Sequence, residues 1–534
     1  MASDLPTSRS GSAPSDALRA TTRLVDALRD PARSPLGGTR IIVLETHVSY
    51  ILLTGDLAYK LKKPLALDFL DFTTLERRRI ACEDELRLNR RTAPELYRRV
   101  VAITGTPDAP RLAGPGEVLE WAVEMRQFDP EALLAKRVET GEVDGALIDD
   151  LARSVAGFHA GLGACAAIRS PGTTVRTNLG EILRMDLSAA LRARCESISV
   201  SLDALLARLE SVLVERERAG FVRECHGDLH LANVALVDGR PVLFDCLEFD
   251  RALRTIDVID EVAFVHMDLL ANGRGDLAHR FVNTYLEETG DYAGVACLRL
   301  FSIHRALVRA KVALIRARQS GLDASAEARI AREIERHVAV AESQASPPKP
   351  RLVITCGLAG SGKTTVSGQL VELLPALRVR SDVERKRMAG LAAAAHSGSP
   401  IGEGLYDREG SLRTYARLEA LARTMLESGQ SVLVDAAFLR RSERAPFRAL
   451  ARQGGFDFRT VVCEAPIEVL RERIEARRAR GRDASEADLA VLDHQLTIHE
   501  RPAGEELEDL VVVRTDGLPA EVLTACRAIA NRGA

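Results

Sequence analysis

The strongest constraint in this chain is a glycine-rich octapeptide, GLAGSGKT at residues 357–364, which fits the pattern GxxxxGK[ST]. An apolar run at 352–356 precedes it and a helical pattern at 364–374 follows it, which is the strand–loop–helix setting that the pattern requires. Glycines let a backbone wrap a phosphate, with N–H groups pointing inward at a helix N-terminus. We therefore predict a phosphate-binding loop whose contact residues are Gly357, Gly360, Ser361, Gly362, Lys363, Thr364 and Thr365.

Two side chains of this loop have distinct predicted roles. Lys363 should reach the β- and γ-phosphates of a nucleotide, and the Thr364 hydroxyl should ligate Mg²⁺. Around the loop, short apolar strands such as SVLVD (431–435) and RTVVCE (459–464) alternate with helical patterns. This alternation predicts a parallel sheet with helices on both faces.

Carboxylates follow two of these predicted strands, at the sheet edge where α/β proteins bind ligands. Asp382 comes after LRVR and is predicted to accept the proton of a substrate hydroxyl, with a helix N-cap as the structural alternative. Asp435 ends SVLVD and suits Mg²⁺ or its water. Arg477 shares a helical face with Arg473 and Arg480. That face is either a lid over the transferring phosphoryl group or a solvated basic surface.

A second catalytic pattern lies in the first half of the chain. Asp228 and Asn233 are separated by four residues in HGDLHLAN (226–233), and Asp245 follows a predicted hairpin that turns at Asp238–Gly239. This is the layout of a kinase catalytic loop. Asp228 would accept the proton of the attacking hydroxyl, while Asn233 and Asp245 would ligate Mg²⁺.

Such a site also needs a lysine for the phosphates, held by a glutamate. Lysine is scarce, with eight among 534 residues, and two of the eight share one face of the predicted strand 57–63. We expect Lys60 to hold the phosphates, with Lys62 as the alternative. Glu85, in a charged helical stretch, is the expected ion-pair partner, ahead of Glu83.

The segment SQASPPKP at 343–350 has the composition of a linker. We therefore divide the chain into four parts. They are a disordered tail with a leading helix (1–39), a two-lobed α+β domain of the protein-kinase type (40–342), the linker (343–350) and an α/β P-loop domain with a parallel sheet (351–534).

The motifs of both halves resemble known families. HGDLHLAN with LFDCLEFD resembles the aminoglycoside phosphotransferase family, which includes choline and fructosamine kinases, and ETHVSYILLTGDLAYKLKKP resembles the N-terminal lobe of a bacterial branch often fused to a P-loop kinase. GLAGSGKTT, SDVERKR, VLVDAAFLRR and RRARGRDASEAD resemble P-loop kinases of the polynucleotide-kinase and gluconate-kinase type. The resemblance implies that Asp382 is the base of the second site and that Asp257 and Asp260 brace the catalytic loop of the first.

Together these features predict a bifunctional ATP-dependent kinase that uses ATP and Mg²⁺ at two independent sites and phosphorylates hydroxyl groups of small molecules. The net charge of −3 and the single tryptophan give no support for a nucleic-acid partner. No apolar stretch reaches the roughly 18 residues of a membrane span. The N-terminus lacks an apolar signal core, and the nine cysteines never form CxxC, which predicts a cytoplasmic protein.

Two alternatives stay open at this point. One half is a regulatory nucleotide sensor that gates the other half, or the P-loop half is a kinase for 5′-hydroxyl ends of nucleic acid. The sequence leaves the acceptors and the oligomeric state undetermined, because acceptor pockets are built from variable loops and helices.

Overall fold

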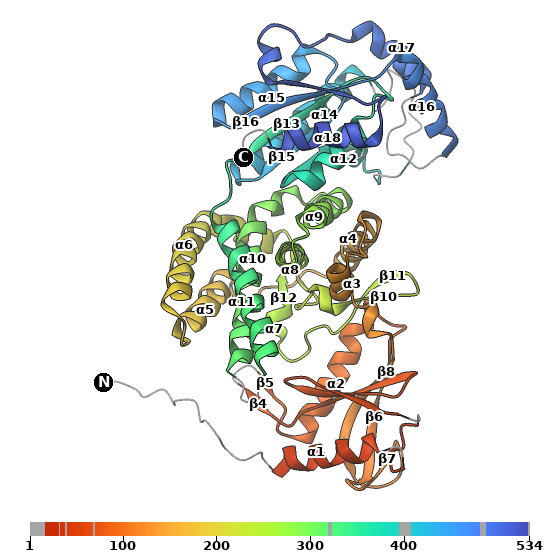
Figure 1. The fold of residues 1–534 in the computed structure, drawn as a ribbon, viewed down its shortest axis with the longest axis vertical. Coiled ribbons are helices and arrows are strands. Elements are labelled where there is room, and N and C mark those ends of the chain that lie inside the picture. Colours follow the sequence, from red (N-terminus) through yellow and green to blue (C-terminus); the bar gives the residue numbers. More distant parts are fainter. Residues whose placement is uncertain are drawn as a thin grey trace. The chain divides into compact units, whose positions relative to one another are not determined.

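The computed structural model describes residues 16–30, 32–37, 40–67, 70–318, 323–392, 395, 407–480 and 488–531 (Figure 1). Its contacts divide the chain into two compact units. The first unit comprises residues 1–140 and 224–255, and the second comprises 141–223 and 256–534. Two of the three boundaries fall within short strands, β9 (Val222–Glu224) and β12 (Thr255–Asp257), and the third follows Thr140.

The first unit is built on an antiparallel sheet in the order β1-β2-β3-β8-β6-β7. Its strands are β1 (Ile42–Glu45), β2 (Ser49–Leu53), β3 (Leu57–Lys62), β6 (Tyr97–Thr106), β7 (Ala109–Leu112) and β8 (Val118–Arg126). Strands β2 and β3 pair antiparallel across Gly55 and Asp56, with Ile51 opposite Lys60. Strands β6 to β8 were not predicted from the sequence.

Two helices pack on this sheet. The predicted leading helix is α1 (Asp16–Arg29), which contacts β7, and the charged helical stretch is α2 (Leu75–Asn89), which packs against β6 and β8. Thr74 caps α2 by accepting a hydrogen bond from the backbone N–H of Arg77. A small hairpin, β4 (Ala66–Leu67) and β5 (Leu70–Asp71), lies between β3 and α2 in the chain.

The remaining elements of the first unit surround the HGDLHLAN segment. They are η1 (Pro130–Ala132), α3 (Leu134–Thr140), η2 (Leu231–Asn233), β10 (Val234–Val237), β11 (Arg240–Leu243) and α7 (Arg251–Arg254). The predicted hairpin is confirmed, since β10 and β11 pair and the turn residues Asp238 and Gly239 have φ of 50° and 79°. The hairpin brings Asp245 back toward the HGDLHLAN segment.

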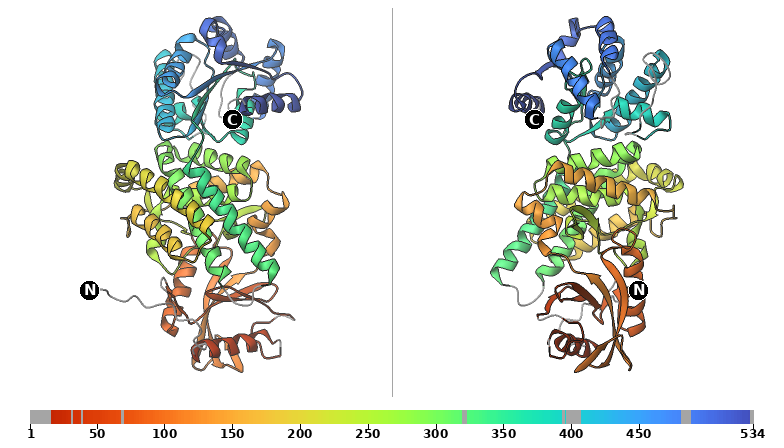
Figure 2. Two further views of the ribbon diagram at one scale, coloured as in Figure 1. Left: turned by 60° about the vertical axis from the view of Figure 1, so that its left-hand side comes forward. Right: turned by 90° about the vertical axis from the view of Figure 1, so that its right-hand side faces the viewer.

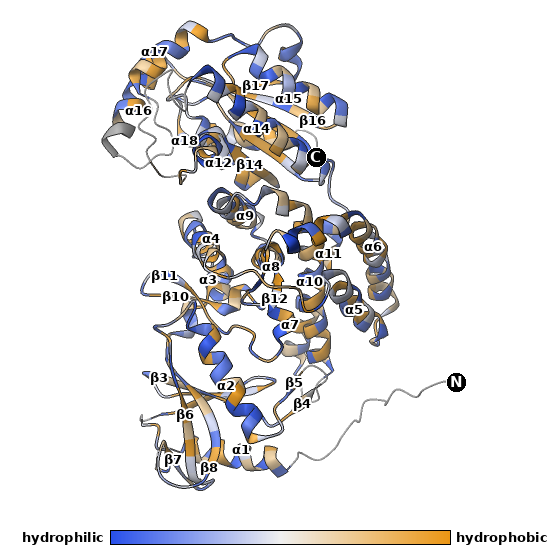
Figure 3. Ribbon diagram, turned by 180° about the vertical axis from the view of Figure 1, so that it is seen from behind, coloured by the Kyte–Doolittle hydropathy of each residue, from blue (hydrophilic) through white to orange (hydrophobic). Residues whose placement is uncertain are grey.

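The second unit begins with helices. They are α4 (Gly145–Ala160), α5 (Pro171–Arg184), α6 (Ala189–Arg218), α8 (Val258–Ala271), α9 (Gly275–Thr289), η3 (Tyr292–Gly294), α10 (Val295–Ala317) and α11 (Ala324–Ala345). Helix α8 is hydrophobic over much of its length (Figure 3) and packs against α9, α10 and α11. Helix α11 continues through Ala345, so the first residues of the predicted linker are helical.

The P-loop domain of the second unit is a parallel sheet in the order β14-β15-β13-β16-β17, with helices on both faces (Figure 2). The strands are β13 (Arg351–Cys356), β14 (Ala376–Arg380), β15 (Ser431–Asp435), β16 (Asp457–Glu464) and β17 (Leu510–Arg514). The helices are α12 (Lys363–Leu373), α13 (Ser381–Met388), α14 (Arg408–Glu427), α15 (Arg441–Gly454), α16 (Ile467–Arg480), α17 (Leu489–Ile498), η5 (Gly504–Asp509) and α18 (Pro519–Asn531). The predicted fold class is confirmed.

All nine cysteines are free. In the described part of the chain, every helix is too short or too polar to cross a membrane.

Candidate active sites

Three segments of the first unit meet at a buried cluster of charges. Lys60 on β3 contacts Glu85 on α2, with 2.9 Å between Nζ and Oε1, and the same Nζ contacts Asp245 after β11. Burial opposes charge on Lys60, but the carboxylates of Asp245, Glu85 and Glu248 raise its pKa well above the usual range. The structure thus joins the predicted lysine, glutamate and metal-binding aspartate.

Lys62 lies on the same face of β3 but has different neighbours. Its Nζ is 2.5 Å from Oε2 of Glu85 and also contacts Glu248, and its side chain is fully buried. Burial opposes ionisation of Glu85, but Lys60 and Lys62 together lower the pKa of Glu85 to about 2. Glu83 is exposed and pairs with Arg79, so the expected preference for Glu85 agrees with the geometry.

The HGDLHLAN segment forms a compact loop in the same unit. The amide Nδ2 of Asn233 donates to the backbone oxygen of Asp228 at 2.9 Å and to its Oδ2 at 3.1 Å. Nε2 of His226 lies 2.9 Å from the backbone oxygen of Phe244, so this nitrogen carries the proton, because a carbonyl only accepts. His226 therefore connects the loop to the residue before Asp245.

Asp245 has a left-handed backbone, with φ of 61°. Such a conformation is strained for a residue other than glycine and is concentrated at functional sites. The Tyr97 hydroxyl accepts a hydrogen bond from the Asp245 backbone N–H at 3.1 Å, which helps to hold it. The carboxylate and amide oxygens of Asp245, Asn233 and Asp228 are hard donors of the kind that Mg²⁺ prefers.

The two lysines of β3 are expected to respond differently to substitution by methionine. Lys60→Met should lower first-site phosphoryl transfer by about 10²-fold, because a charge near the phosphates is lost. Lys62→Met should lower the free energy of unfolding by about 3–5 kcal/mol, because Glu248 is left buried without its cation. Initial rates and urea unfolding of both variants separate these effects.

The reverse pattern of effects would contradict the assignment of Lys60. If Lys62→Met stops transfer in a fully stable protein while Lys60→Met is silent, Lys62 is the phosphate lysine and our preference is wrong.

In the second unit, the loop between β13 and α12 has the shape of a phosphate cradle. Gly357, Gly360 and Gly362 have φ of 147°, 78° and 82°, a region that favours glycine. A Cβ on Gly357 would lie 2.6 Å from the Cys463 carbonyl oxygen, and one on Gly360 would lie 2.7 Å from that of Leu470. The fold therefore requires glycine at these positions.

Lys363 folds back onto this loop. Its Nζ donates to the backbone oxygens of Gly357 and Leu358, at 2.8 and 2.7 Å. Burial lowers the pKa of Lys363. Thr364 and Thr365 lie exposed in the first turn of α12, and the buried Ser361 hydroxyl has no hydrogen-bond partner in the described residues. The loop thus presents a lysine, hydroxyls and a helix N-terminus, all suited to the phosphates of ATP.

Two carboxylates stand at the carboxyl edge of the parallel sheet. Asp435 ends β15 and accepts a hydrogen bond from Oγ of Ser367 at 2.6 Å. Asp382 lies in the first turn of α13, whose N-cap is Arg380, so the N-cap alternative for Asp382 is wrong. Burial raises the pKa of Asp382, an effect that Arg380 and Arg385 partly oppose. The Asp435 carboxylate adds to this rise in the pKa of Asp382, and the Lys363 ammonium group opposes it.

The remaining predicted residues are Arg477, Asp257 and Asp260. Arg477 falls in α16, but its side chain lies outside the described residues. Arg473 of the same helix donates to the Gly360 carbonyl oxygen at 3.3 Å and therefore supports the loop. Asp257 and Asp260 form buried ion pairs with Arg216 and Arg305, at 2.6 and 2.7 Å.

Three residues at these sites were not predicted from the sequence. They are Tyr97 and Glu248 in the first unit and Ser367 in the second. Glu248 follows Asp245 by three residues in LFDCLEFD, and this spacing was a usable signal. Tyr97 and Ser367 gain their roles through contacts distant in sequence, which no local pattern reveals.

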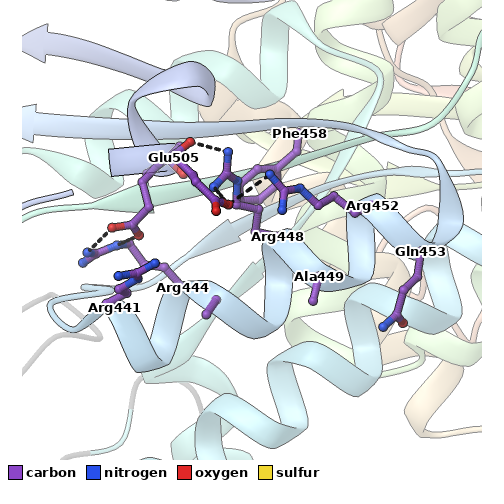
Figure 4. Close-up of a pocket in the computed structure, with 11 residues that line it drawn as sticks. Arg441, Arg444, Arg448, Ala449, Arg452, Gln453, Phe458 and Glu505 are labelled. Carbon is purple, nitrogen blue, oxygen red and sulfur yellow. Dashed lines mark hydrogen bonds and ion pairs between the residues drawn. The ribbon is translucent and has the colours of Figure 1, made fainter. Parts of the chain in front are cut away.

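A cavity of about 340 Å³ lies on the P-loop domain between α15 and η5 (Figure 4). Its wall carries the arginines Arg441, Arg444, Arg448 and Arg452. Arg444 pairs with Glu506 at 2.7 Å, and Arg448 pairs with Glu505 at 3.2 Å and with Asp509 at 2.9 Å. These ion pairs hold η5 against α15, and none of the residues that line the cavity belongs to the phosphate-binding loop.

Family models and relatives match both parts of the chain. The Phosphotransferase enzyme family matches residues 72–301, and the AAA domain matches residues 352–502. The uncharacterized proteins Rv2004c of Mycobacterium tuberculosis and Mb2027c of Mycobacterium bovis are each 32% identical over 464 residues, which cover 85% of this chain and 89% of the relative.

Solved structures resemble each part in turn. Amicoumacin kinase hAmiN, in complex with AMP-PNP, Ca²⁺ and Ami, is 12% identical and covers 61% of this chain and 95% of its own, with a TM-score of 0.38. A gluconokinase from Sinorhizobium meliloti 1021 is 22% identical and covers 35% of this chain and 94% of its own, with a TM-score of 0.26.

The two family models indicate the chemical class of the chain. The chain is an ATP-dependent kinase. It belongs to the family of these mycobacterial proteins, as a member with a kinase-like phosphotransferase domain followed by a P-loop domain.

Proposed function

We propose that the chain is a bifunctional phosphotransferase with two separate sites, each of which phosphorylates a hydroxyl group of a small molecule. The proposal is supported by the contacts in each unit among the residues to which the sequence analysis gave the roles of base, Mg²⁺ ligand and phosphate lysine. In the first unit Lys60 contacts Glu85 and Asp245, and Asn233 contacts Asp228; in the second unit Lys363 contacts the loop carbonyl oxygens, and Ser367 contacts Asp435.

In the first site, Asp228 would take the proton of the attacking hydroxyl. Asn233 fixes the Asp228 carboxylate by a direct hydrogen bond, so that its free oxygen lone pairs are oriented. Lys60, held by Glu85, would bind phosphate oxygens, while Asn233 and Asp245 would hold Mg²⁺. Bound Mg·ATP supplies the γ-phosphoryl group and the positive charge of the metal.

In the second site, Asp382 would act as the base. Its burial makes the carboxylate more basic than an exposed aspartate, which favours proton transfer near neutral pH. Lys363 would exchange the carbonyl oxygens of Gly357 and Leu358 for phosphate oxygens. Thr364 and Asp435 would hold Mg²⁺ or its water.

The proposal is tested by incubating the full chain with Mg·ATP and a small-molecule extract, and by mass spectrometry of the products. Arms with sugars, amino alcohols, nucleosides and 5′-hydroxyl oligonucleotides identify the acceptor class. We expect phosphate esters of small molecules. Preferential labelling of the oligonucleotide would favour the nucleic-acid alternative, and the absence of any phosphate ester would contradict the proposal.

A further inference from the structure

Helix α9 of the second unit covers the free edge of the parallel sheet. Strand β14 is an edge strand, and the buried side chain of Asn283 on α9 donates to the Ala376 oxygen at 3.0 Å and accepts from the Arg378 N–H at 2.5 Å. A residue of a neighbouring parallel strand would pair with the same two groups. Asn283 therefore takes the place of a sixth strand at the edge that leads to Asp382.

One turn further along α9, Glu287 forms ion pairs with the same strand. Its carboxylate is 2.7 Å from Arg378 and 3.5 Å from Arg380, and all three side chains are about 15% exposed. Partly buried arginine–carboxylate contacts fix both partners more firmly than exposed ones do. Glu287 thus sets the positions of the two arginines that precede the acceptor-site helix α13.

A chain of contacts continues from Glu287 to the predicted metal ligand. Nη1 of Arg378 donates to Oγ of Ser367 at 3.4 Å, and Oγ of Ser367 donates to Oδ2 of Asp435 at 2.6 Å. A hydroxyl has one hydrogen and two lone pairs, so Ser367 accepts from the arginine while it donates to the carboxylate. Glu287 therefore acts on Asp435 through two intervening side chains.

The C-terminal end of α9 also contacts α13. Arg387 of α13 donates to the Glu287 backbone oxygen, and its guanidinium lies 5.8 Å from the ring centre of Tyr292. Gly290, with φ of 73°, ends α9, and a Cβ there would lie 2.7 Å from Nε of Arg387. Helix α13, which carries Asp382, is thus held near both of its ends, by Arg380 at the N-cap and by Arg387 in the last turn.

We propose that α9 is an integral part of the P-loop site and that Glu287 is a positioning residue for Asp435 and Asp382. This inference rests on the proposed transfer activity of the P-loop domain. Sequence alone places α9 in the preceding domain, more than sixty residues before the phosphate-binding loop. On this view the P-loop domain does not form a complete site without the helices that precede it.

The test uses three variants of the full chain. Glu287→Gln keeps the size of the side chain but removes its charge, and Glu287→Asp keeps the charge. The matched control is Glu288→Gln, since Glu288 lies on the same helix, is 43% exposed and pairs with Arg153 at 3.5 Å, away from the sheet edge.

We expect Glu287→Gln to lower P-loop kcat by about tenfold and to raise the Mg²⁺ concentration needed for half-maximal rate, since residues that orient metal ligands have effects of this size. Glu287→Asp should recover part of the loss, and Glu288→Gln should match the original protein. First-site transfer should not change in any of the three. Equal rates and equal Mg²⁺ dependence in Glu287→Gln and the original protein would overturn the inference.

A second measurement needs no turnover. Protection of residues 357–364 from hydrogen exchange, titrated with Mg·ADP, reports binding at this loop alone. Weaker protection in Glu287→Gln than in Glu288→Gln supports the inference, even if the original protein transfers no phosphate and the proposed function fails. Identical titrations in the two variants overturn it.

Discussion

Asp228→Asn should reduce first-site phosphoryl transfer by about 10³-fold. Asparagine has nearly the same size and can keep the contact with Asn233, but it cannot accept a proton. ATP binding at this site should persist, because Lys60, Glu85 and Asp245 are unchanged. The measurement is the initial rate with the acceptor of the first site, together with the affinity for a non-hydrolysable ATP analogue.

The matched control is Asp238→Asn. Asp238 lies in the same unit, at the exposed turn of the β10–β11 hairpin, and asparagine tolerates its positive φ. We expect this variant to keep the original rate. A general base contributes a rate factor of about 10² or more. If Asp228→Asn retains more than about a tenth of the original rate, the loss of rate is too small for a general base, and Asp228 is not the base.

Lys363→Met should reduce P-loop transfer by about 10²–10³-fold, the cost of removing one donor that stabilises transition-state charge. Methionine matches the length of lysine and is tolerated in buried positions, so the loop should keep its fold. First-site transfer should be unaffected, because Lys60 supplies the corresponding charge there. Rates for both acceptors, measured on one preparation, give the result.

Lys349→Met serves as the control for this variant, because Lys349 is exposed just before β13 and contacts neither site. An equal loss of both activities in Lys363→Met would show that the two reactions share a single nucleotide site.

Motifs with fixed spacing were predictable from the sequence, since the chemistry itself sets their spacing. GLAGSGKT favours a cradle because glycine adopts the positive φ of Gly357, Gly360 and Gly362 without steric cost. The interval from Asp228 to Asn233 places both side chains on one short loop, and the structure shows them hydrogen-bonded. Local sequence also predicted the β10–β11 hairpin, through Asp238–Gly239.

The sequence alone could not decide whether Lys60 or Lys62 binds the phosphates. Both side chains point to the same side of β3, and what separates them is contact with residues about 185 positions later, Asp245 for Lys60 and Glu248 for Lys62. Strand alternation gives the face of a sheet but not the partner that packs against it.

The contribution of α9 was hidden for a similar reason. Asn283 and Glu287 look like ordinary polar residues of an amphipathic helix, and their partners on β14 lie about 90 residues away. The linker composition of 343–350 suggested two separate domains, whereas the contacts place the helices before it and the P-loop domain in one compact unit. A change of composition along the chain therefore does not show that the segments on its two sides fail to pack together.

The presence of two separate transfer sites is tested most directly by combining Asp228→Asn with Lys363→Met in the full chain and following label from γ-³²P-ATP into the products. We predict that each single variant loses a different set of labelled products and that the double variant loses both sets. One common set of products, lost equally in either single variant, would contradict two sites. A double variant that labels its acceptors at the original rate would contradict the assignment of Asp228 and Lys363 to these sites.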